Sequence, residues 1–259
     1  MTEAGHGRYL FAVARGVGEQ GVAGVTGIRG APLDVVPHRD LEAVVCEVDL
    51  AEFGEVALTR NLEDLAWLEE VARAHNEVVF AAASRGTVAP MRLVTIYADD
   101  QSVRARIEEL YDDLTAALDR VEGRREWSVK VFTQPDAEPG AEEAARAEVG
   151  SGPGAGAAYL RRKRDQATRR QASREQAVEL AGQVHRALGD QSVASRRLAP
   201  QDPRLTGRTE TMVLNAAYLV PVEQGDDFRA AAEQLDARHH ELSVEVEGPW
   251  PPYSFATLE

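Results

Sequence analysis

The chain has 259 residues, and its 43 acidic and 29 basic side chains give a formal charge of −14. This length accommodates two small domains or one large one, and a composition of 44% hydrophobic and 28% charged residues excludes a disordered tail or a membrane-spanning protein. The negative charge argues against general nucleic-acid binding, which depends on neutralising phosphates. A single cysteine, Cys46, cannot form an internal disulfide or a cysteine-ligated zinc site.

The beginning of the chain and the distribution of charge refine this description. Met1–Gly7 has neither the basic start nor the apolar run of a secretory signal, so we expect a cytoplasmic protein. The net charge is −13 over residues 1–150, +7 over 159–208 and −8 over 209–259. The arginine-rich middle segment therefore either pairs with the acidic part of its own chain or meets a partner.

The first part of the chain alternates strand and helix patterns. Strand formers predict strands at 9–14 and 41–48, and between them a glycine-rich stretch, 16–30, cannot form a stable helix. The next helix is predicted from apolar residues spaced three and four apart, which are Leu62, Leu65, Leu68, Ala72, His75 and Val79.

A strand at 88–97 follows, although Pro90 favours an edge position or a later start. One long helix is predicted from the stripe Val103, Ile107, Leu110, Leu114, Leu118 and Val121. Its N-cap candidates are Asp99, Asp100 and Ser102, and Gly123 stands where a C′ glycine belongs. Alternation at Trp127, Val129 and Val131 predicts a strand. The order β-β-α-β-α-β indicates an antiparallel sheet with two helices on one face, over residues 1–134.

Residues 135–156 combine three prolines, five acids and repeated glycines, and are predicted to be a linker. A smaller α/β domain, 157–259, is predicted after it, and it opens with a long helix over 159–188. Strands at 193–198 and 211–220, a short helix around Phe228 and a last strand at 242–247 complete that domain.

Two patterns in the sequence suggest sites of chemistry. Gly16–Gly21 matches the dinucleotide motif G-x-G-x-x-G, but further glycines and Pro32 forbid the helix that such a site requires, so we interpret it as a turn. His75 lies on the apolar stripe of its helix and is either a hydrogen-bonded core histidine or a ligand or catalytic base. The sequence contains no nucleophile elbow, P-loop or metal-ligand spacing. We therefore predict no enzyme, no cofactor and no metal site.

Two segments suggest binding to a partner. The basic run Arg161, Arg162, Lys163 and Arg164 is either a solvated helix face or a docking surface. RNA recognition would call for interleaved aromatic or glycine residues, which are almost absent there. The ending G-P-W-P-P-Y-S-F, residues 248–255, carries Trp250, Tyr253 and Phe255, which either fold back onto the domain or dock on a partner.

Several segments taken together resemble the gas vesicle accessory protein family GvpF/GvpL over nearly the whole chain. They occur in the family's order at 9–13, 75–79, 89–95, 159–163, 214–220 and 248–255. The ordered set is specific, above all the tyrosine-leucine-basic run at 159 and the proline-aromatic ending. The sequence departs from the family at Leu93-Val94, where members often read phenylalanine-glycine.

This resemblance implies two α/β domains, the first of them ferredoxin-like, and a non-enzymatic part in building gas vesicles. It implies as partners the small hydrophobic shell protein and other accessory proteins, with neither nucleic acid nor membrane. We expect the basic run to dock electrostatically, and Trp250, Tyr253 and Phe255 to be apolar contacts or the lock of the tail. The alternative from another class is a small-molecule-binding regulatory module, which needs a polar-lined pocket of roughly 300 Å³ or more between the domains.

Overall fold

The computed structural model describes residues 5–134, 155–201, 208 and 210–256, so the predicted linker lies almost entirely outside the described residues. The chain divides into two compact units, and each is built around one sheet. The first unit comprises Met1–Glu126 and Gly248–Glu259, and the second comprises Trp127–Glu247. This division differs from the predicted one, because buried side chains of the C-terminal tail belong with the first unit.

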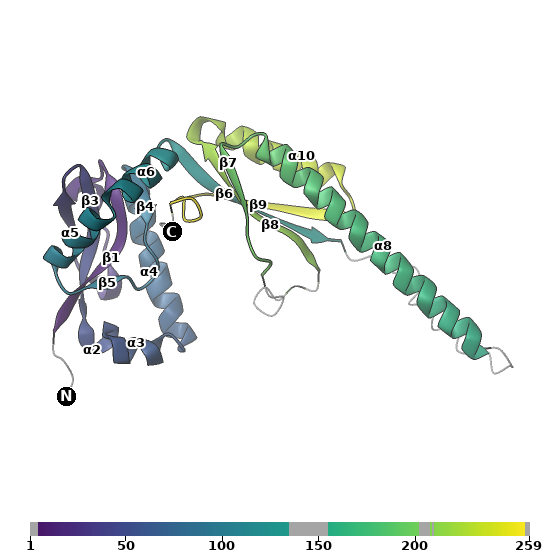
Figure 1. The fold of residues 1–259 in the computed structure, drawn as a ribbon, viewed down its shortest axis with the longest axis horizontal. Helices are drawn as coiled ribbons and strands as arrows, with labels where there is room; N and C mark the ends of the chain where they lie inside the picture. The colour runs from purple at the N-terminus through teal and green to yellow at the C-terminus, as the bar shows by residue number, and fades with distance from the viewer. Residues whose placement is uncertain (1–4, 135–154, 202–207, 209, 257–259) are drawn as a thin grey trace. The chain divides into compact units, whose positions relative to one another are not determined.

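The first sheet has the order β2-β3-β1-β4, and β5 also pairs with β1 (Figure 1). Its strands are β1 (His6–Arg15), β2 (Leu33–His38), β3 (Leu41–Asp49), β4 (Thr87–Pro90) and β5 (Ile96–Tyr97). β1 pairs antiparallel with β3, β4 and β5. The mixed α/β fold with antiparallel sheets is thus confirmed, and so are the strands predicted at 9–14 and 41–48. β2 was missed, since its sequence mixes apolar residues with Asp34 and Pro37.

The helices of the first unit are α1 (Gly18–Gly21), α2 (Leu50–Phe53), α3 (Glu55–Asn61), α4 (Leu65–Ala83), α5 (Asp100–Glu109) and α6 (Tyr111–Val121), with a 3₁₀ turn at Ile28–Gly30. The helix predicted over 103–121 breaks at Leu110 (φ −104°, ψ 14°) into α5 and α6. Asp99 and Ser102 form a capping box at its start, and Gly123 has a φ of +67° after its end.

α4 packs through a different stripe from the predicted one. Its buried residues are Trp67, Val71, His75, Val78, Val79, Ala82 and Ala83. Leu65 is 79% exposed, because Asp64 caps the helix there and makes Leu65 its first residue. From Trp67 onward the stripe contacts the same hydrophobic cluster as Tyr9 and Phe11 of β1.

The strand predicted at 88–97 is two strands, and the connection between them holds Val94 at a φ of +63°. A β-branched residue is strained in this left-handed region, which glycine occupies freely. The backbone at this position is therefore one that favours glycine over valine.

Val94→Gly and Val94→Ala both remove the branched, half-buried side chain and differ by a single methyl group, so backbone freedom is their main difference. We expect Val94→Gly to be the more stable variant by about 1 kcal/mol, the reverse of the usual order of these residues. Urea unfolding of both variants measures the difference. A lower stability for glycine than for alanine would show that this backbone is not strained.

The second sheet has the order β7-β8-β6-β9. The elements of the second part are β6 (Arg124–Thr133), α8 (Ala155–Gly189), β7 (Ala194–Arg197), β8 (Met212–Pro221), α10 (Gly225–Arg238) and β9 (Leu242–Trp250), with a 3₁₀ turn at Val222–Gln224. The last half of α8 packs into this unit's core through Ala177, Ala181, Val184 and Leu188. The helices and strands predicted over 157–259 are confirmed, and β9 continues past the predicted end to Trp250. The strand predicted at 127–131 is also present as β6, but it belongs to the second sheet and not, as predicted, to the first.

Candidate functional site

Two backbone amides of the glycine motif of the first unit already bind a carboxylate. The backbone N–H groups of Val17 and Gly18 donate hydrogen bonds to Oε2 of Glu42, at 2.8 and 3.0 Å. The helix that follows, α1, has four residues. A dinucleotide needs both the amides and a longer helix N-terminus, so the structure supports the interpretation of this motif as a turn.

His75 is a core histidine. It is 2% exposed, and its Nδ1 lies 3.0 Å from the hydroxyl of Tyr9, which also accepts a hydrogen bond from the backbone N–H of Val94. The Nε2 atom has no hydrogen-bond partner among the described residues. Burial lowers the pKa of His75 to about 4, against a smaller opposing effect of the Met91 backbone. The ring therefore faces a phenol rather than the carboxylate or nucleophile that a catalytic base would need.

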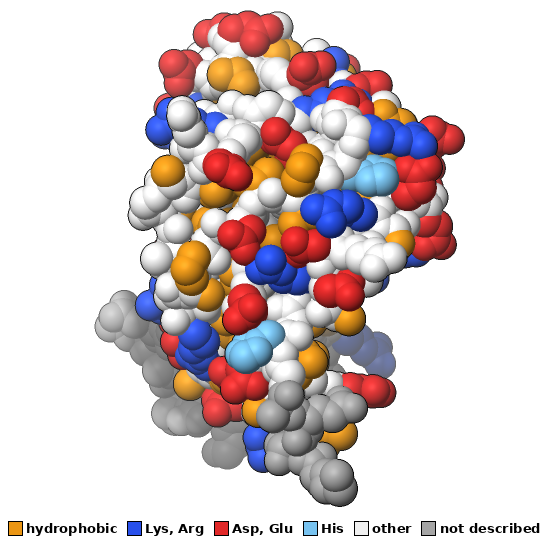
Figure 2. Space-filling model, turned by 90° about the vertical axis from the view of Figure 1, so that its left-hand side faces the viewer, with side chains coloured by type: hydrophobic (Ala, Val, Ile, Leu, Met, Phe, Trp, Pro, Cys, Tyr) orange, Lys and Arg blue, Asp and Glu red, His pale blue; other side chains and the backbone are white. Residues whose placement is uncertain are grey.

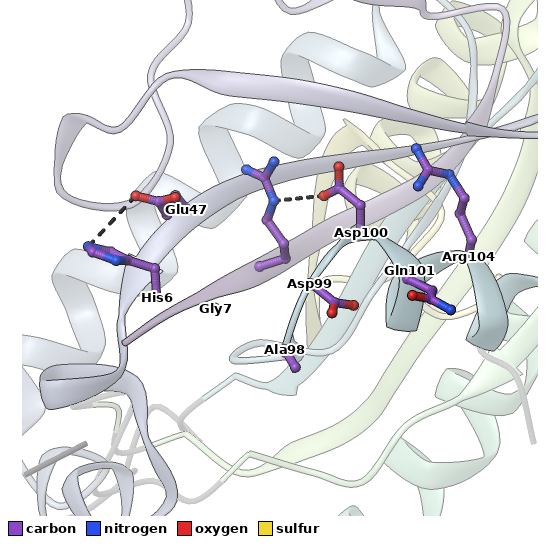
Figure 3. Close-up of a pocket in the computed structure, with 9 residues that line it drawn as sticks. His6, Gly7, Glu47, Ala98, Asp99, Asp100, Gln101 and Arg104 are labelled. Atoms are coloured by element: carbon purple, nitrogen blue, oxygen red, sulfur yellow. Dashed lines mark hydrogen bonds and ion pairs between the residues drawn. The ribbon is translucent and has the colours of Figure 1, made fainter. Parts of the chain in front are cut away.

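A polar hollow of about 480 Å³ lies on the first unit, where the start of β1 meets the start of α5 (Figure 3). Its charged groups are engaged in contacts within the first unit. Arg8 donates hydrogen bonds to Asp34 and Asp100, both at 2.7 Å, and His6 lies 3.7 Å from Glu47. Asp99 accepts a hydrogen bond from the Ser102 backbone N–H, which lowers the pKa of the carboxyl group.

Among the residues that the structure describes, no group of three or more His, Cys, Asp or Glu side chains is placed to hold a metal ion. No helix in the described part of the chain is both long and apolar enough to cross a membrane. Figure 2 shows acidic and basic side chains interspersed on one face of the protein, with hydrophobic side chains scattered between them.

The C-terminal tail folds back onto the first unit. The Tyr253 hydroxyl donates to Oδ1 of Asn76 at 2.7 Å, and Nε of Arg120 donates to the Phe255 carbonyl at 2.9 Å. The backbone N–H and the hydroxyl of Ser254 each donate to the carboxylate of Glu126 at 2.7 Å. Burial raises the pKa of Glu126, and the Ser254 hydrogen bonds oppose that effect. Phe255 is 8% exposed.

Trp250 stands apart from the rest of the tail because its side chain is 39% exposed. It meets Phe80 of α4, which is 37% exposed, with the ring centroids 5.5 Å apart and the planes at 79°. This edge-to-face geometry is a favourable one for aromatic rings. We call Trp250 and Phe80 the aromatic pair. The sequence indicates Trp250 through the aromatics and prolines around it, but it gives no signal for Phe80, which is one of several apolar residues in the second half of α4.

The basic run lies near the start of α8. The side chains of Arg161, Lys163 and Arg164 are exposed, and none of them forms an ion pair with a described residue. Arg162 belongs to the same helix, but its side chain lies outside the described residues. The structure thus keeps the tail residues and the aromatic pair together on the first unit, while the basic run belongs to a helix of the second.

Comparison with known proteins identifies the family. The family model described as gas vesicle synthesis protein GvpL/GvpF matches residues 7–257. Gas vesicle protein L of Streptomyces sp. strain CB03234 is 38% identical, with 97% of this chain and 93% of that protein covered. Gas vesicle protein F of the same strain is 28% identical and covers 74% of this chain and 80% of its own length.

Solved structures agree at the level of the fold. The crystal structure of the gas vesicle protein GvpF from Anabaena sp. PCC7120 superposes with a TM-score of 0.67 at 19% identity, covering 98% of this chain and 97% of that one. The GvpF structure from Microcystis aeruginosa gives a TM-score of 0.64, also at 19% identity, and covers 97% of this chain and 99% of its own. The chain belongs to the gas vesicle synthesis protein GvpL/GvpF family.

Proposed function

We propose that this chain is a cytoplasmic assembly factor of gas vesicles. It binds the hydrophobic shell protein, together with other accessory proteins, while vesicles form, and it catalyses no reaction. Membership of the GvpL/GvpF family supports the link to gas vesicles. The observation that carries the proposed binding is the exposed aromatic pair, Trp250 and Phe80, on the first unit.

An exposed tryptophan next to an exposed phenylalanine suits an apolar partner. Tryptophan is enriched among the residues that dominate binding energy at interfaces, and large apolar surface exposed to water favours contact with other apolar surface. A shell subunit that exposes apolar surface before incorporation offers such a contact. The hydrogen bonds of the tail hold Trp250 in place before the partner arrives, which reduces the ordering cost of binding.

The other tail residues hold the tail, and with it Trp250, in place. Tyr253 bonds to Asn76 and Phe255 is buried, so they fix the tail on the first unit and leave Trp250 to meet the partner. Arg161, Arg162, Lys163 and Arg164 supply positive charge for electrostatic docking on another element, α8. The protein therefore offers an apolar contact and a basic one on separate elements.

Co-purification with the gas vesicle shell protein tests the proposal. We expect Trp250→Ala, and separately Phe80→Ala, to reduce the captured shell protein at least tenfold, since an aromatic anchor contributes about 2 kcal/mol or more. Leu65→Ala is the matched control, because Leu65 is an exposed apolar residue of the same helix as Phe80. Undiminished capture by both aromatic variants would refute this assignment.

The small-molecule alternative is less well supported. The polar hollow exceeds the roughly 300 Å³ that a ligand site needs, but it lies on the first unit, whereas this alternative predicts a pocket between the domains. Of its two arginines, Arg8 is bound to two carboxylates and Arg104 donates to the Pro37 carbonyl, and its Asp99 caps a helix. A ligand would have to displace these contacts before it could form its own, so the hollow is better explained as a surface held together by ion pairs.

A further inference from the structure

One side of α8 can be followed from the half that packs on the core into the half that does not. In its second half the side that faces the core carries Ala177, Ala181, Val184 and Leu188, at spacings of four, three and four. With about 3.6 residues per turn, the same spacings continue toward the N-terminus through Arg174, Arg170, Ala167 and Lys163. The side chain of Arg170 lies outside the described residues. Arg161 and Arg164 fall on other sides of the helix. The line that is apolar where α8 meets its own core is therefore basic where it leaves that core.

The first half of α8 has no core of its own. Every described side chain from 161 to 176 is exposed, and Ala177 is the first buried one. In Figure 1 the strands of the second unit lie alongside the second half of α8, and the first half continues past them. A helix of this length is usually stabilised by packing rather than by propensity alone, so an exposed stretch of several turns is a natural place for a partner.

Several arginines of the first unit form ion pairs, unlike the described cations of this line. Arg8, Arg15, Arg29 and Arg39 each form an ion pair with a carboxylate. Lys163 and Arg174 form none with a described residue. Their charge is thus available to a negatively charged partner without breaking a described ion pair.

We propose that the line formed by Lys163, Ala167 and Arg174 docks an acidic α-helix of a partner protein. The inference rests on the proposed function, since it names a second class of partner for the same assembly factor. Spacings of three and four residues are the repeat with which one helix packs along another. Ala167 adds little bulk to the line, and the cations on either side of it attract carboxylates.

An acidic helix fits this line better than a nucleic acid does. The two cations are about 16 Å apart along the axis, at 1.5 Å per residue, which corresponds to three turns of a facing helix. Described side chains on the exposed stretch include no aromatic residue for stacking on bases. Phosphate binding would in addition use cations on all sides of α8 equally, whereas a helix uses one side.

Two variants of the full chain with equal changes of charge separate these outcomes. Lys163→Glu with Arg174→Glu lowers the charge of the proposed line by four. The control, Thr168→Glu, Gln171→Glu, Ala172→Glu and Gln176→Glu, lowers the charge by the same amount at exposed positions on other sides of the same stretch. The probe is a labelled synthetic helical peptide with leucine and alanine at three-and-four spacing and glutamate on both flanks, measured by fluorescence anisotropy at physiological salt. A lysine version of this peptide and a single-stranded RNA serve as comparison probes.

We expect the line variant to weaken binding of the acidic peptide at least tenfold and the control variant by no more than about threefold. Equal losses in both variants, or RNA binding as tight as peptide binding, would overturn the oriented helix site in favour of general charge attraction. Binding that neither variant weakens would also overturn it. Capture of the shell protein by the line variant separates the helix-docking proposal from the proposed function. Retained capture together with lost peptide binding supports both. Loss of capture by Trp250→Ala tests only the proposed function.

Discussion

Phe255→Ala is expected to lower the free energy of unfolding by about 3 kcal/mol, the usual cost of truncating a buried phenylalanine. The ring is 8% exposed, and the backbone on both sides of it is held by Arg120 and Glu126. The loss has two sources, the apolar surface returned to water and the cavity left behind. If the tail also loosens, the buried carboxylate of Glu126 loses its two donors, which adds to the cost.

Trp250→Ala is the matched control in the same segment. Because Trp250 is partly exposed, we expect this variant to lose only about 1 kcal/mol. Urea unfolding monitored by circular dichroism measures both variants at equal protein concentration. Similar losses for the two would mean that Phe255 does not lock the tail, and a small loss for Phe255→Ala alone would mean that the tail is not part of the folded unit.

The second large effect is a loss of stability in acid that depends on His75. Its pKa is about 4 in the folded chain and about 6.5 in an unfolded one. A depressed folded pKa means that the unfolded state binds the proton more readily, so stability is full above pH 6.5 and falls as the pH drops toward 4. This one residue is expected to cost about 3 kcal/mol by pH 4.

His75→Gln tests this origin, since a glutamine can still accept the Tyr9 hydroxyl but does not titrate. The measurement is the difference in unfolding free energy between the native chain and the variant at pH 7 and at pH 4. Glu126, whose pKa is raised, favours the folded state as the pH falls, but it is present in both proteins and cancels. A difference that stays constant with pH would contradict the buried, neutral histidine.

Sequence patterns predicted most elements because apolar residues repeat where a helix or strand meets one core. Helix α8 and the strands β1, β3, β6 and β8 all follow this rule. Breaks without glycine or proline could not be predicted. Leu110 divides α5 from α6 through its backbone geometry, and Val94 takes a conformation that a β-branched residue rarely adopts.

The candidate site was predictable only in its sequence-local part. Three aromatics among prolines at the C-terminus indicated a tail that folds back or docks. The partners that hold it are Asn76, Arg120 and Glu126, which lie more than 120 residues away and in three different elements. Only the fold brings such residues together, because no local pattern distinguishes Glu126 from the many surface carboxylates of this acidic chain.

The basic run shows the same limit in another way. The sequence alone suggested four adjacent cations, from Arg161 to Arg164, as one docking surface. The structure shows which side of α8 faces the core. Lys163 lies on the same side of the helix as Arg174, whereas its neighbours Arg161 and Arg164 lie on other sides. The direction of a helix face depends on what the helix packs against, which is a tertiary property.

The most direct test of the central claim is site-specific photo-crosslinking in cells that form gas vesicles. A benzophenone amino acid replaces Trp250 in one variant and Leu65 in the other, so that two exposed positions of the first unit are compared. We expect a crosslink to the gas vesicle shell protein at position 250 and none above background at position 65. A shell-protein crosslink at neither position, or at position 65 alone, would contradict the account.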